Sequence, residues 1–215
     1  MPNINELDLT PESVPEIIWD APESGSFPPQ VKPGTHEFAF ALGDDPWDML
    51  EIQKQKCLQV VYSATTDTQE HGEVTLNFQR ATTFQSAAMR QNGTNHMIGE
   101  LIRSLAIRIE GPVNKDSISE VLTSASAERR HFRADVGWRR YCKSCDTTVS
   151  TNPRKKKGDV PWPRTEDKQF EMAVSCPSCG DRGYGNAEII RFKLPDAGTQ
   201  VMVYSTTEAQ GVSPF

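Results

Sequence analysis

Four of the five cysteines in this chain fall in two pairs of the form C-x-x-C, and this spacing constrains the fold more than any other feature of the sequence. Two such pairs can bring four thiolates to the corners of a tetrahedron around one Zn²⁺ ion. A metal held by four thiolates has no open coordination position, so it would be structural and would not activate water. The expected ligands are Cys142, Cys145, Cys176 and Cys179.

The residues around the pairs fit the knuckles of a zinc ribbon. Tyr141 and Val174 end strand-like runs just before the two pairs, and Gly180 provides a tight turn after the second. Two other interpretations stay open at this point: a pair of disulfides would need an oxidising compartment, and a thioredoxin-like redox motif would need one pair at a strand–helix junction. The fifth cysteine, Cys57, lies in an expected strand and is interpreted as a buried, inert thiol.

The length and hydropathy of the chain limit its class. Its 215 residues suffice for one domain with an insertion or for two small domains. It has no long apolar run, and no charged segment followed by an apolar one at its N-terminus. The sequence therefore predicts neither a transmembrane helix nor a secretory signal. We expect an intracellular, cytoplasmic protein with no membrane partner, in a compartment where thiolates stay available for metal.

The formal net charge of −6 hides an uneven distribution of charge. Residues 1–50 carry ten acidic side chains and a single cation, Lys32, whereas residues 129–157 carry ten cations and two acids. A basic segment beside the cysteine pairs is the electrostatic footprint expected of a site for a polyanion. A solvated surface without any ligand explains the same run equally well.

The expected secondary structure is mainly β. Residues 1–33 are acidic and proline-rich and should form a largely disordered arm, and residues 205–215 should form a flexible tail. Between them, apolar and polar side chains alternate as they do in strands. The strands expected from this pattern, the last of them an edge strand, are 38–42, 56–64, 74–79, 131–141, 187–194 and 201–204.

Turns and helices interrupt this pattern. Turn residues gather at 43–46, and those at 67–72 form a hairpin loop. After the third strand the periodicity becomes helical. The expected helices are 86–90, 97–105 and one that begins at the capping box Ser117–Glu120.

The order of these elements predicts a fold. Three strands, a helical segment, one long strand and a last strand beyond the second cysteine pair follow the order of the OB-fold, a five-stranded barrel. We therefore expect an α+β, mainly β protein with an OB-like barrel over residues 34–141 and 185–204. The zinc ribbon, residues 142–184, would be inserted between strands four and five. That connection borders the oligonucleotide face of OB-folds.

Several stretches of the chain resemble phage-encoded OB-fold single-stranded-DNA-binding proteins, namely 34–40, 58–64, 74–80, 99–107 and 185–192. The resemblance implies binding of single-stranded DNA without strong sequence preference, in replication or recombination, in the host cytoplasm. The chain differs from this family by its zinc ribbon and by its acidic N-terminus, because bacterial single-strand binders generally carry their acidic, partner-recruiting tail at the C-terminus. A replication or recombination protein bound to the arm 1–33, and a second copy of the chain, are the further partners considered.

The expected nucleic-acid contacts combine cations with aromatic rings. Cations neutralise phosphates without a fixed register, and rings stack on bases. Strand periodicity favours the core for Phe78, and makes the core at least as good a place for Trp138 as the surface. The candidate contacts are Arg80, Phe84, Arg139, Arg140, Tyr141, Lys143, Arg154, Lys155, Lys156, Lys157 and Trp162.

Two other function classes are an enzyme and a protein-interaction module. No P-loop, G-x-S-x-G or HExxH motif occurs, and the four histidines have no metal or triad spacing, so no enzymatic activity is expected. The alternative to nucleic-acid binding is a protein-interaction module, in which the ribbon and the acidic arm dock onto a replication, transcription or virion assembly. The acidic sequence pI of about 5.3 favours this alternative.

Overall fold

The computed structural model of the chain describes residues 28, 30–52, 55–84, 97–111, 113–153 and 158–205. Over these residues the protein is α+β, with strands predominating and two helices. The expected strands at 56–64, 74–79, 131–141 and 187–194 are present as β2, β3, β5 and β10. In chain order the elements are β1 (Gly34–Ile52), β2 (Gln55–Thr68), β3 (Gly72–Phe84), α2 (Met97–Ser104), β4 (Ile107–Glu110), α3 (Lys115–Ala127), β5 (His131–Cys142), β6 (Thr147–Ser150), β7 (Val160–Pro161), β8 (Ala173–Ser175), β9 (Arg182–Tyr184), β10 (Asn186–Phe192) and β11 (Met202–Ser205).

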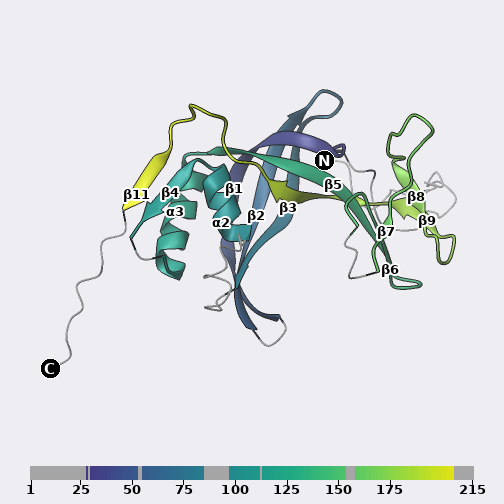
Figure 1. Cartoon of the computed structure of the whole chain (residues 1–215), viewed down its shortest axis with the longest axis horizontal. Helices are drawn as coiled ribbons and strands as arrows, with labels where there is room; N and C mark the ends of the chain where they lie inside the picture. Colours follow the sequence, from purple (N-terminus) through teal and green to yellow (C-terminus); the bar gives the residue numbers. More distant parts are fainter. Residues whose placement is uncertain are drawn as a thin grey trace, which may run out of the picture.

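One sheet of seven strands runs through the molecule (Figure 1). Strands β3, β2 and β1 form an antiparallel meander, and β1 pairs in turn with the first half of β5. The other edge of β5 pairs with β10, and the last residues of β5 pair with β6. Among the described residues no backbone ladder joins β10 to β3, so the sheet is not closed into a barrel. A side chain bridges the two strands instead, because the Ile189 N–H donates to Gln79 Oε1 at 3.0 Å.

Strand β1 is longer than its sequence suggested. Residues 43–46 carry turn-forming side chains and were expected to follow the first strand as a turn. They lie inside β1, where the register with β2 shifts between Leu42 and Trp47. The excess residues are accommodated as an irregularity of the strand, which then resumes its pairing.

Strand β3 contains a bulge that changes which side chains face the core. Its register with β2 shifts between Tyr62 and Ala64, and Phe78 takes the left-handed value φ 55° at this point. The extra residue breaks the alternation of the two faces. Phe78 is 74% exposed, so its expected place in the core is wrong.

The two helices were expected, but one begins at a different residue. α2 buries Ile98, Leu101 and Ile102, as its periodicity predicted. The N-cap of α3 is Asn114, whose Oδ1 accepts from the Ser117 N–H at 2.8 Å while Ser117 Oγ accepts from the Asn114 N–H at 2.9 Å. Ser117 is thus the third residue of the helix and not its cap, because asparagine competes well for that position. The helix expected at 86–90 lies outside the described residues.

The main hydrophobic core joins both helices to β1, β2, β3, β5 and β10. At its centre the ring of Phe132 lies between 5.6 and 6.4 Å from four other aromatic rings. The expected edge strand at 201–204 is present as β11, which pairs in parallel with β4, a strand that was not expected. No helix of the described part is long and apolar enough to cross a membrane.

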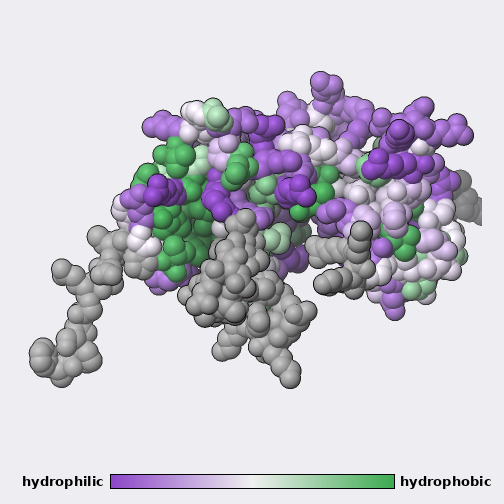
Figure 2. Space-filling model, in the orientation of Figure 1, coloured by the Kyte–Doolittle hydropathy of each residue, from purple (hydrophilic) through white to green (hydrophobic). Residues whose placement is uncertain are grey.

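A second, smaller core lies in the region of the cysteine pairs. It consists of Trp138, Val149, Trp162 and Val174, with Phe170 and Ala187 packed against it. β6 and β7 extend the large sheet into this region, whereas β8 and β9 form their own antiparallel pair. In the view of Figure 2, hydrophobic residues gather around α3, β4 and β11, whereas the opposite, ribbon end mixes hydrophilic and intermediate residues.

Candidate metal centre and the neighbouring groove

The two cysteine pairs meet in space and could hold one metal ion. The Sγ atoms of Cys142, Cys145, Cys176 and Cys179 all lie within 4.8 Å of one another. Two of the cross-pair distances are 3.5 Å, from Cys142 to Cys179, and 3.3 Å, from Cys145 to Cys176. A tetrahedral Zn²⁺ site with Zn–S bonds of about 2.3 Å has S···S edges of about 3.8 Å. All four cysteines are free thiols, and both of these cross-pair distances are far above the roughly 2.05 Å of an S–S bond, so the disulfide alternative is wrong.

The local backbone has the form expected of two knuckles. Cys142 is the last residue of β5 and Cys176 directly follows β8. The residue after each pair is left-handed, Asp146 at φ 56° and Gly180 at φ 78°. In the second knuckle the Gly180 N–H donates to Cys176 O at 2.8 Å. Among the described residues neither pair starts a helix, so the thioredoxin-like alternative also fails.

The thiols do not ionise equally in the absence of a cation. Burial disfavours the Cys176 thiolate, but hydrogen bonds from the Ser178 and Cys179 backbone N–H groups and from the Cys145 thiol prevail, and they lower its pKa to about 6. The Asp181 N–H favours ionisation of Cys179, but hydrogen bonds with the other thiols dominate and raise its pKa to about 12. A bound cation would be needed to hold all four groups as thiolates.

Arg140, expected to contact phosphate, is a structural residue of the candidate metal centre. Its side chain is 6% exposed. Nη1 donates to Val174 O at 3.0 Å and to Asp181 O at 2.7 Å, and Nη2 donates to Asp181 Oδ2 at 2.6 Å. The same carboxylate oxygen lies 3.7 Å from Cys142 Sγ. Arg140 therefore connects β5 to the second knuckle and is not available to a ligand.

Trp162 was expected to stack on bases, and the structure contradicts this. It is 3% exposed, and its Nε1 donates to Glu171 O at 2.7 Å. Its ring lies 5.7 Å from that of Trp138, in an edge-to-face arrangement. Trp138 is also buried, and it donates from Nε1 to Val31 O at 2.7 Å. Both indoles are needed for the small core, since it has few other large side chains.

The remaining candidates near the knuckles are dispersed. Tyr141 is 57% exposed, but its hydroxyl donates to the Asp146 carboxylate, which raises the pKa of Tyr141. Arg139 pairs with the buried carboxylate of Asp159 at 3.5 Å. Lys143 is exposed in the first knuckle. The basic run Arg154, Lys155, Lys156 and Lys157 lies outside the described residues, as does the side chain of Phe84.

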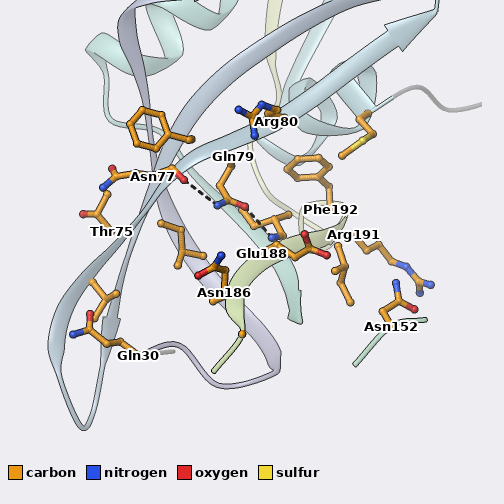
Figure 3. A pocket seen from close by; sticks show the side chains of 18 of the residues that line it. Gln30, Thr75, Asn77, Gln79, Arg80, Asn152, Asn186, Glu188, Arg191 and Phe192 are labelled. Carbon is orange, nitrogen blue, oxygen red and sulfur yellow. Dashed lines mark hydrogen bonds between the residues drawn. The ribbon is translucent and has the colours of Figure 1, made fainter. Parts of the chain in front are cut away.

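A groove of about 1090 Å³ lies where β3 and β10 face each other without pairing (Figure 3). Arg80, on β3, is the one candidate from the sequence with a described side chain that lines it. Sequence reasoning missed two other lining residues, Phe78 on β3 and Arg191 on β10. The alternation along 189–193 was the only sequence signal that indicated an outward-facing Arg191. No sequence pattern predicted the bulge that exposes Phe78.

Comparison of the chain with protein-family models, with curated proteins and with solved structures found no significant match. The resemblance to phage single-stranded-DNA-binding proteins therefore stays a prediction.

Proposed function

We propose that this protein binds single-stranded DNA along the groove between β3 and β10. The observation that carries the proposal is that Phe78, which is 74% exposed, lines the same groove as two arginines, Arg80 on one wall and Arg191 on the other. Aromatic rings that stack on bases, combined with cations that meet the backbone, are how proteins hold single strands without reading a fixed sequence. A role in replication or recombination, and recruitment of a partner by residues 1–33, belong to the same proposal.

The connectivity of the sheet supports an OB-like architecture, which is the finer fold that we propose. β1, β2 and β3 form a meander, helices follow β3, β5 pairs with β1, and β10 pairs with β5 and faces β3. This is the strand order of a five-stranded OB barrel that stays open between its third and fifth strands. The metal-centre region occupies the connection between the fourth and fifth strands. Asn152, in that region, and Gly185, which directly follows it, line the groove.

We also infer that the metal is a single structural Zn²⁺ ion. Four thiolates in tetrahedral reach suit Zn²⁺ better than hard cations, which prefer oxygen ligands. With four protein ligands the ion would have no site for substrate, so its contribution would be to folding. Its place in the mechanism is to hold the ribbon that forms one end of the groove.

The test is fluorescence anisotropy of a labelled single strand against the full, metal-loaded protein at two salt concentrations, with duplex of equal length as competitor. We expect affinity to fall by about 0.7 log units per tenfold rise in salt for each phosphate neutralised. Phe78→Ala should cost about 1–3 kcal/mol of binding free energy through lost stacking. Val203→Ala, an exposed apolar truncation on β11, is the matched control and should cost nothing. Absence of binding at low salt would overturn the proposal.

The rival function, a protein-docking module, is favoured by one observation. Arg139 and Arg140, which enter the metal centre, are engaged within the protein by Asp159 and Asp181 and leave less positive charge for DNA. Charge reversal at Arg140 cannot separate the two functions, because it would disrupt the ribbon. The double variant Arg80→Glu, Arg191→Glu can separate them. If the groove is the binding site, this variant should lose DNA binding. If the ribbon is a docking site for a protein, the variant should still bind that protein. Arg108→Glu, on β4, is the control.

A further inference from the structure

Side-chain amides are the commonest polar groups in the groove between β3 and β10. Two of them are engaged within the protein. Gln79 donates from Nε2 to Asn77 O at 3.2 Å and accepts from the Ile189 N–H, which fixes the bulge, and Gln59 donates to Thr82 Oγ1 at 3.2 Å. The amides that line the groove are Gln30, Gln59, Asn77, Gln79, Asn152 and Asn186.

The other four side-chain amides have no hydrogen-bond partner among the described residues. Figure 3 shows Asn77 on the β3 side of the groove and Asn186 on the β10 side, with Gln30 and Asn152 at its margins. All four residues are exposed to solvent. Each carboxamide thus offers a free carbonyl acceptor beside a free NH₂ donor.

The formal charge of the groove balances. Arg80 and Arg191 are matched by Glu100 and Glu188, which line the same space. Attraction of phosphates alone therefore gives this groove little advantage over the rest of the surface. Its distinguishing chemistry is the set of paired donors and acceptors, together with the exposed ring of Phe78.

We propose that the groove recognises the bases of the single strand by their edges, in addition to the backbone that Arg80 and Arg191 contact. This rests on the proposed function and names the part of the ligand that is recognised. The free amides of Asn77 and Asn186 hydrogen-bond the Watson–Crick edges of unpaired bases, and Phe78 stacks on one of them. Every base carries a donor next to an acceptor on that edge, and a carboxamide can turn to match either order, so recognition needs bases but tolerates their sequence. A duplex is excluded because its Watson–Crick edges are already paired.

The experiment compares a thymine homopolymer with an abasic strand of equal length, both labelled, against the full metal-loaded protein. The wild-type protein should bind the base-bearing strand at least about tenfold more tightly than the abasic one, since each good contact to a base edge contributes a factor of this order. The double variant Asn77→Leu, Asn186→Leu keeps the shape of both side chains and removes their polar atoms. It should lose about tenfold or more on the base-bearing strand and nothing on the abasic strand.

The control is Gln200→Leu, an exposed amide that does not line the groove, which should leave both affinities unchanged. Equal binding of abasic and base-bearing strands by the wild-type protein would overturn this inference and leave single-strand binding intact, and this comparison does not depend on any variant folding. A double variant that binds the base-bearing strand as tightly as the wild type would overturn it too. If neither strand binds, the proposed function falls together with the inference.

Discussion

The sheet body and the ribbon are built on one continuous set of strands, yet they are stabilised differently. The body, formed by β1, β2, β3, β5, β10 and the two helices, has a large core with an aromatic cluster at its centre. The ribbon, residues 142–184, has a core of four buried side chains, one of which, Trp138, comes from β5. A core of that size cannot offset the conformational entropy of some forty ordered residues, which is why domains of roughly this size need metals or disulfides. The body should be stable through apolar burial, and the ribbon through the metal ion that we propose for its four cysteines.

Removing the metal is the strongest test of this difference. In zinc-finger peptides a structural Zn²⁺ ion contributes about 10–16 kcal/mol at neutral pH. Loss of the ion, by chelation or through Cys176→Ser, should therefore unfold the ribbon completely while the body stays folded. Hydrogen exchange read by mass spectrometry should show lost protection in β8 and β9 and retained protection in β1, β2 and β3.

The matched control for the lost thiol is Cys57→Ser, in β2. This cysteine lies far from the four expected ligands in the sequence and is not one of them. The variant should keep one metal ion per chain, measured by elemental analysis, which also identifies the ion. Retained protection of β8 and β9 after complete chelation would mean that the ribbon is stable by itself.

Truncation of a ring in the aromatic cluster should destabilise the body and not the ribbon. Phe132 is 2% exposed and its ring lies 5.6 Å from that of Phe38 and 5.7 Å from that of Phe192. Phe132→Ala should cost about 3–5 kcal/mol of the free energy of unfolding, because it removes apolar contacts and leaves a cavity. Urea unfolding followed by circular dichroism measures the loss. Phe78→Ala, equal in chemistry but on an exposed ring, should change stability by far less.

Local sequence patterns predicted the parts of the molecule that depend on local rules. The paired cysteines predicted the cluster of four thiols because the knuckle is set by a few consecutive residues, and alternation predicted β5 because it has one face in the core. The failures have a common cause in tertiary contacts. Arg140 and Trp162 look like surface ligands in the sequence, but in the ribbon Arg140 holds the second knuckle and Trp162 fills the small core.

The prediction for Phe78 was wrong in the opposite sense, because a residue expected in the core is exposed. Its position in the alternation of β3 placed it inside, and a one-residue bulge moved it out. A bulge inverts the face of a residue without leaving a mark in the hydrophobic period, so no count of alternating residues could detect it. The groove was missed for the same reason, since it forms where β3 and β10 approach without pairing and both strands are irregular.

The smallest predicted effect concerns the point where the two regions meet. Gly185 links β9 to β10, and a Cβ atom there would lie 2.7 Å from Cη2 of Trp162 and 3.0 Å from Arg139 O. Gly185→Ala should therefore cost about 1–3 kcal/mol by overpacking the ribbon core against β5. Gly43→Ala, where a Cβ meets nothing within 4 Å, is the control and should be nearly neutral. Urea unfolding gives the cost in free energy, and hydrogen exchange shows where it falls. Lost protection confined to the ribbon would show that the two regions unfold separately, whereas an equal loss in β1, β2 and β3 would show that the shared strand β5 couples them into one cooperative unit.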